Sequence, residues 1–131
     1  MKAYTDLEQS KKLAKILPLE SADMHYNNVS IKGVNYVDEY RAELMEYNRA
    51  IKVLSKYTIN PLFGVTPCWS LAVLYSLLPE QTDISKSYSD NCETIIYWCW
   101  NSAFDIETKE YDNPVDACVE MILKLNELKM L

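Results

Sequence analysis

The sequence predicts a single compact α+β domain, 1–131, and two patterns carry this prediction. Apolar residues recur at three- and four-residue intervals in several segments, which is typical of helices that bury one face. Residues 94–100 are all β-branched, aromatic or cysteine, which is typical of a buried strand. We expect about four helices and a small, mostly antiparallel sheet around 94–111.

The first predicted helix covers 6–17. Thr5 and Glu8 match a capping box, in which the Thr5 hydroxyl accepts from a backbone amide and Glu8 reaches back to the amide of Thr5. Pro18 ends this helix, because a proline inside a helix removes a hydrogen bond and clashes with the preceding turn.

The last predicted helix covers 114–129. Asn113 is a favourable N-cap, Pro114 suits the first helical position, and Asp116 lies in the first turn, where the helix dipole favours negative charge. The residues of its buried stripe share the spacing of one helical face: Val115, Cys118, Ile122, Leu125 and Leu128.

Two further helices are predicted in the middle of the chain. The segment 38–56 has apolar residues on one helical side, among them Tyr40 and Tyr47. The segment 67–78 begins with Pro67 and is apolar on most sides, which indicates a central helix. The polar segment 81–91 between this helix and the strand is expected to be a loop with at most a short strand.

The predicted strand alternates between two apolar faces. Ile96, Trp98 and Trp100 lie on one face, and Ile95, Tyr97 and Cys99 lie on the other. Either helices cover both faces or one face serves a partner.

Composition excludes several classes of function. The formal net charge is −6, which repels phosphate backbones, so no nucleic acid is expected as a partner. With two glycines the chain has no phosphate-binding loop, and one histidine with scattered cysteines gives no zinc-ligand spacing, so neither a cofactor nor a metal is expected. The four cysteines, together with the lack of a secretory signal or a membrane-spanning apolar run, predict reduced thiols in the cytoplasm, away from membranes.

Cys68 is the one candidate nucleophile. At the start of the predicted helix 67–78, the helix dipole would lower the pKa of its thiol. The string Cys68-Trp69 resembles the start of the nucleophile helix in papain-like proteases, but no histidine follows it, and the only histidine is His25 upstream. Two possibilities follow: the chain has no catalytic residues, or it is an enzyme that uses a Cys68–His25 dyad.

Several segments together resemble a family of small uncharacterised proteins from Bacteroides-type gut bacteria and their phages or mobile elements. The resemblance lies in PCWSLA at 67–72 and DNPVDACVEMI at 112–122, with MKAYTDLEQS at 1–10 and KLNEL at 124–128. The resemblance to this family implies no activity, cofactor or site residues. The resemblance implies an intracellular setting and favours an accessory or interaction role.

Two hypotheses of function follow from the sequence. The first is a non-enzymatic accessory domain that binds a partner protein, or a second copy of itself as a homodimer, through Tyr40 and Tyr47 or through Trp98 and Trp100. The alternative is a small cysteine hydrolase that uses Cys68 and His25.

Overall fold

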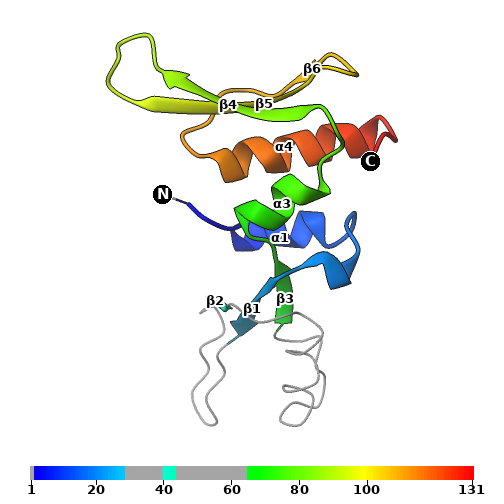
Figure 1. The fold of residues 1–131 in the computed structure, drawn as a ribbon. Helices are drawn as coiled ribbons and strands as arrows, with labels where there is room; N and C mark the ends of the chain where they lie inside the picture. Colours follow the sequence, from blue (N-terminus) through cyan, green and yellow to red (C-terminus); the bar gives the residue numbers. More distant parts are fainter. Residues whose placement is uncertain (1, 29–39, 44–64) are drawn as a thin grey trace. The chain divides into compact units, whose positions relative to one another are not determined.

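The computed structural model describes residues 2–28, 40–43 and 65–131 (Figure 1). The chain divides into two compact units, Asp6–Ser70 and Met1–Thr5 together with Leu71–Leu131. The predicted α+β class is confirmed, since the described residues form three α-helices, one 3-10 turn and two three-stranded antiparallel sheets. That both units belong to a single domain stays a prediction.

The unit Asp6–Ser70 begins with helix α1 (Leu7–Leu13), which is shorter than the predicted helix 6–17. Its capping box lies one residue later than predicted: the Asp6 carboxylate accepts from the Gln9 amide at 2.8 Å, and the Gln9 side chain accepts from the Asp6 amide at 3.1 Å. Thr5 is instead fully buried. The sequence fits both boxes, and the one that forms uses Asp6 and Gln9.

The sheet of this unit has the order β2-β1-β3, with β1 at Met24–Asn28, β2 at Tyr40–Glu43 and β3 at Val65–Cys68. The predicted helix 38–56 is therefore wrong at Tyr40–Glu43, where the backbone pairs with β1. The rest of that predicted helix lies outside the described residues. Backbone pairing with a distant strand overrides the helical spacing of the apolar residues here.

The predicted helix 67–78 also begins too early. Pro67 and Cys68 belong to β3, and helix α3 covers only Leu71–Leu77. Proline fits this place because β3 lies at the edge of the order β2-β1-β3 that the described residues form, and an edge strand tolerates a residue without an amide hydrogen. The sequence alone does not distinguish a proline at the start of a helix from a proline in an edge strand.

The second unit contains the sheet β4-β5-β6, with β4 at Thr82–Tyr88, β5 at Ile95–Asn101 and β6 at Ile106–Glu107. The predicted strand and the antiparallel sheet around it are confirmed. The segment predicted as a loop forms β4, which pairs with β5 along its whole length. The polar residues of this segment give no apolar strand pattern in the sequence. A strand at the edge of a sheet can form without one, because it needs few apolar side chains.

Helix α4 (Pro114–Glu127) lies along one face of this sheet, and α3 packs against α4 (Figure 1). The predicted start is confirmed, since the Asn113 side chain accepts from the Asp116 amide at 2.9 Å and Pro114 is the first helical residue. Four members of the predicted stripe are fully buried, but Leu128 lies beyond the helix and is 53% exposed.

The N-cap of α4 gives a first prediction. Replacing Asn113 by alanine should lower the free energy of unfolding by about 1 kcal/mol, because the Asp116 amide loses its acceptor. Urea denaturation followed by circular dichroism measures the change. Asn126→Ala, at an exposed position near the other end of α4, is the matched control. An equal loss of stability in both variants would contradict the capping role.

Candidate functional site

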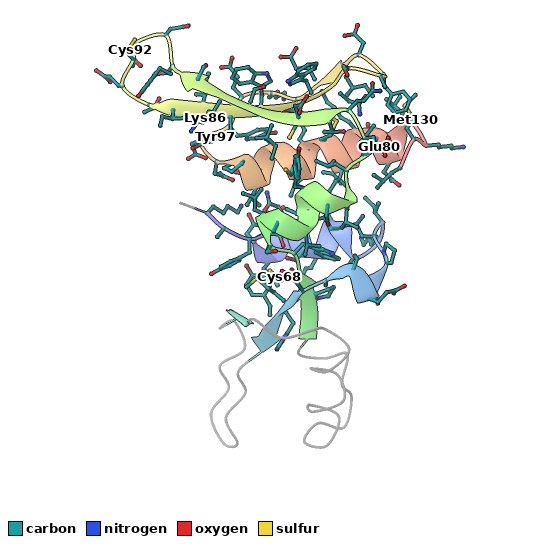
Figure 2. The ribbon with its side chains drawn as sticks, in the orientation of Figure 1. Cys68, Glu80, Lys86, Cys92, Tyr97 and Met130 are labelled. Atoms are coloured by element: carbon teal, nitrogen blue, oxygen red, sulfur yellow. The ribbon has the colours of Figure 1, made fainter. Side chains whose placement is uncertain are left out.

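The side of the sheet β4-β5-β6 that faces away from α4 carries the two tryptophans of β5. Tyr97 lies on the α4 side (Figure 2), and the Cys99 thiol is 3.9 Å from the Cys118 thiol of α4. Because side chains alternate along a strand, Trp98 and Trp100 project from the opposite face. Trp100 remains 38% exposed, so this face keeps an accessible aromatic surface.

The strand register places an acidic residue on each side of Trp100. Glu107 of β6 lies directly opposite Trp100 on one side, and Asp83 of β4 lies directly opposite it on the other. Residues that are directly opposite in an antiparallel pair share a face of the sheet. Both carboxylates therefore lie on the same face as the exposed indole.

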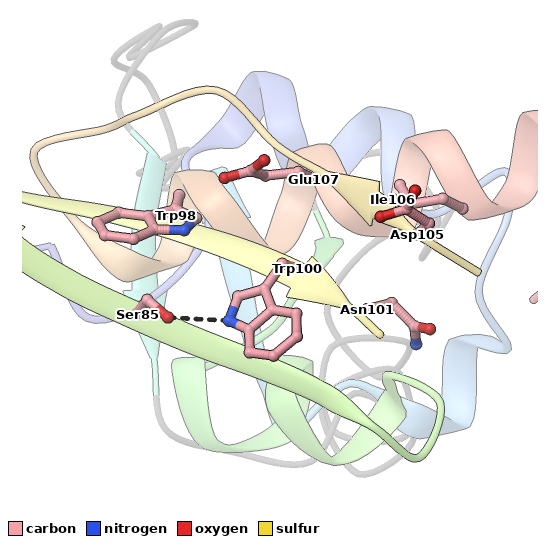
Figure 3. Close-up of a pocket in the computed structure, with 7 residues that line it drawn as sticks. All are labelled: Ser85, Trp98, Trp100, Asn101, Asp105, Ile106 and Glu107. Carbon is pink, nitrogen blue, oxygen red and sulfur yellow. Dashed lines mark hydrogen bonds between the residues drawn. The ribbon is translucent and has the colours of Figure 1, made fainter. Parts of the chain in front are cut away.

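A hollow of about 340 Å³ opens at this place (Figure 3). Within it, the Trp100 indole nitrogen donates to the Ser85 hydroxyl at 2.9 Å, which fixes the plane of the ring. The lining residues come from β4, β5, β6 and the turn before β6: Ser85, Trp98, Trp100, Asn101, Asp105, Ile106 and Glu107.

Asn101 holds the turn that brings Asp105 to the hollow. Its side-chain oxygen accepts from the Phe104 amide at 3.0 Å, and its side-chain nitrogen donates to the Thr82 hydroxyl at 2.8 Å. Asp105 adopts a φ of 54°, a left-handed conformation that aspartate and asparagine tolerate better than most residues. Because Asn101 is 1% exposed, this turn is fixed by a buried side chain.

Glu120 of α4 holds the segment that follows β6. Its carboxylate accepts from the Tyr111 hydroxyl at 2.8 Å and from the Lys109 amide at 3.0 Å. Burial, and then the hydrogen bond to Glu120, raise the pKa of Tyr111 to about 12. Lys124 adds an ion pair with Glu120 at 3.5 Å and donates to the Glu107 carbonyl at 2.8 Å, so α4 also positions β6.

The two candidate catalytic residues lie on neighbouring strands but on opposite faces of their sheet. Cys68 of β3 is directly opposite Met24 of β1, and it packs in a cluster with Met24 and Tyr26. His25 lies between these two residues in β1, so its side chain projects from the other face. Cys68 also ends a strand rather than starting a helix, and this arrangement does not favour a Cys68–His25 dyad.

The predicted interaction residues have different outcomes. Tyr40 begins β2, so the helical face that would align it with Tyr47 does not form at this point, and Tyr47 lies outside the described residues. Trp98 and Trp100 meet at the hollow. The structure thus brings together one of the two predicted pairs.

The remaining thiols show no sign of an active site. Cys99 and Cys118 are fully buried against each other, and their hydrogen bond together with burial raises the pKa of Cys118 far above its ordinary value. Cys92 is exposed in the loop at the end of the β4–β5 hairpin (Figure 2). Among the described residues, no three histidine, cysteine or acidic side chains gather in a way that could hold a metal ion.

The sequence alone does not single out Ser85, Asp105 and Glu107 as members of the site. The predicted antiparallel sheet around 94–111 implies a partner strand for β5, but the sequence does not specify the register of that pairing. The register alone decides that Glu107 lies beside Trp100.

Comparison with models of protein families, with curated proteins and with solved structures finds no match to this chain. No helix within the described ranges is long and apolar enough to cross a membrane. The geometry of the hollow is therefore the main indication of function.

Removing the Asn101 side chain should destabilise the turn beside the hollow. Asn101→Ala leaves the buried Thr82 hydroxyl and the Phe104 amide without their partners, and we expect a loss of about 2 kcal/mol in the free energy of unfolding. Chemical denaturation measures it. A loss below about 0.5 kcal/mol, the usual size for a surface substitution, would show that the turn does not depend on Asn101.

Tyr111 should make stability fall at alkaline pH. Its pKa is raised in the folded state from 10 to about 12, so the unfolded chain loses the phenol proton first as the pH rises. The contribution of Tyr111 is complete below pH 10 and is lost between pH 10 and about 12.

Tyr111→Phe should therefore flatten the loss of stability in this pH window, measured by urea denaturation at several pH values. Tyr88→Phe, at a residue that is 68% exposed, should leave the wild-type decline unchanged. The same decline in all three proteins would contradict the role of Tyr111.

Proposed function

We propose that the chain is a non-enzymatic module that binds a partner protein through the face of the sheet β4-β5-β6 that carries Trp98 and Trp100. One observation carries the proposal: two tryptophans line a hollow on the face opposite α4, and Trp100 is 38% exposed. Tryptophan is enriched among the residues that dominate binding energy at protein interfaces.

The local packing supports a preformed binding surface. The hydrogen bond from Trp100 to Ser85 fixes the indole, and the buried Asn101 fixes the adjoining turn. A rigid aromatic side chain loses little conformational freedom on binding, which lowers the entropic cost of association. The surface therefore does not need to order itself when a partner arrives.

An accessory role of this kind agrees with what the family resemblance implies. Self-association through the same face is the other form of the proposal, with a second copy of the chain as the partner. The cysteine hydrolase has no supporting observation, since Cys68 and His25 project from opposite faces of their sheet.

The test compares partner capture by three tagged proteins in quantitative affinity purification. Replacing Trp98 and Trp100 by alanine should remove a protein that the wild type retains, with affinity reduced more than about tenfold. The control, Tyr88→Ala, changes a more exposed aromatic residue of β4 that does not line the hollow, and it should retain the same protein.

Identical protein sets from all three would contradict the proposal. Circular dichroism establishes that each variant is folded. Sedimentation of the purified protein separates the two forms: a dimer that the double tryptophan variant abolishes would assign the face to self-association.

A further inference from the structure

We propose that the hollow receives an arginine side chain of the partner protein. This inference rests on the proposed function and adds the chemistry of what is bound. Its elements are the two indoles, the carboxylates around them and the size of the hollow.

The charged residues that line the hollow are negative. Asp105 and Glu107 line it, and the register puts Asp83 beside Trp100 on the same face. None of the seven lining residues is basic. A cation is therefore the charge complement of this surface, while nucleic acid is repelled by it.

The carboxylates are not engaged elsewhere in the described part of the chain. Within it, the side chains of Asp105 and Glu107 make neither an ion pair nor a hydrogen bond. Lys124 donates to the backbone carbonyl of Glu107 and leaves its carboxylate available. Both residues are exposed. Bringing a cation to them thus breaks no existing contact, and no group of acidic side chains there is suited to a metal ion.

The tryptophans favour arginine over other cations. A cation above an indole face is attracted by the electrons of the ring, and tryptophan is the strongest aromatic partner. The planar guanidinium stacks on such a face and still donates to carboxylates through its edge, whereas the lysine ammonium is a compact, strongly hydrated charge. Trp100 offers the face and Glu107 the carboxylate directly opposite it in the register.

The size of the hollow agrees with a single side chain. About 340 Å³ lies at the lower end of the range of ligand pockets, which is roughly 300–1,000 Å³. The hollow therefore has room for one long side chain of a partner. The affinity for an isolated arginine side chain is accordingly weak and falls with added salt.

The test uses the whole chain labelled with ¹⁵N and a short blocked peptide that contains one arginine. Three otherwise identical peptides carry lysine, citrulline or alanine in its place. We expect the arginine peptide to shift the indole signals of Trp98 and Trp100 in a concentration-dependent manner. Trp69 is the internal control, because it is fully buried and its indole donates to Ser21.

The carboxylates are tested by a matched pair of variants. Asp105→Asn with Glu107→Gln should weaken the binding of the arginine peptide about tenfold, equal to about 1.4 kcal/mol. Asparagine also tolerates the positive φ at 105. The control, Asp90→Asn with Glu127→Gln, removes the same charge from two exposed positions outside the hollow and should bind as the wild type does.

Three results would overturn the proposal: no shift of Trp98 and Trp100 at the highest peptide concentration, equal shifts with citrulline or lysine, or equal weakening by both variant pairs. Partner capture separates this failure from that of the proposed function. If the tryptophan variant loses the partner and the Asp105–Glu107 variant retains it, only the arginine proposal falls. If both retain it, the interaction function falls as well.

Discussion

The packing of β5 against α4 is the constraint on which the rest of its unit depends. Cys99 and Cys118 are fully buried, with their sulfur atoms 3.9 Å apart, so strand and helix approach closely at this point. Small side chains permit such a close approach, and a larger residue at either position would separate the two elements. Because one face of β5 is used in this contact, alternation along the strand directs Trp98 and Trp100 to the other face.

The same arrangement links stability to the candidate site. Glu120 and Lys124 hold the chain after β6 and the backbone of β6 itself from the α4 side. Asn101 fixes the turn between β5 and β6 from within the core. The hollow is therefore formed by side chains that point outward from a backbone fixed on its inner side. This is the physical basis for treating it as a preformed surface.

Local signals were sufficient for several elements. Asn113 and Pro114 specify the start of α4 because the cap involves only residues within one turn. The run at 94–100 indicates β5 because β-branched and aromatic residues are enriched in strands. The α+β class and the pair of tryptophans on one face of the strand follow from these signals. The hollow could not be predicted, because the register of β6 brings Glu107 to Trp100.

The sequence by itself thus determined the elements whose hydrogen bonds close within a few residues, together with the face on which each β5 side chain lies. Only the tertiary structure decided the elements whose hydrogen bonds come from distant strands. Tyr40–Glu43 has helical spacing yet pairs with β1, and Pro67 suits a helix start yet lies in an edge strand. The tertiary structure also decided that Cys68 and His25 project from opposite faces of their sheet. The reason is physical: strand pairing satisfies backbone groups across long separations in sequence, and local propensity carries no information about the partner.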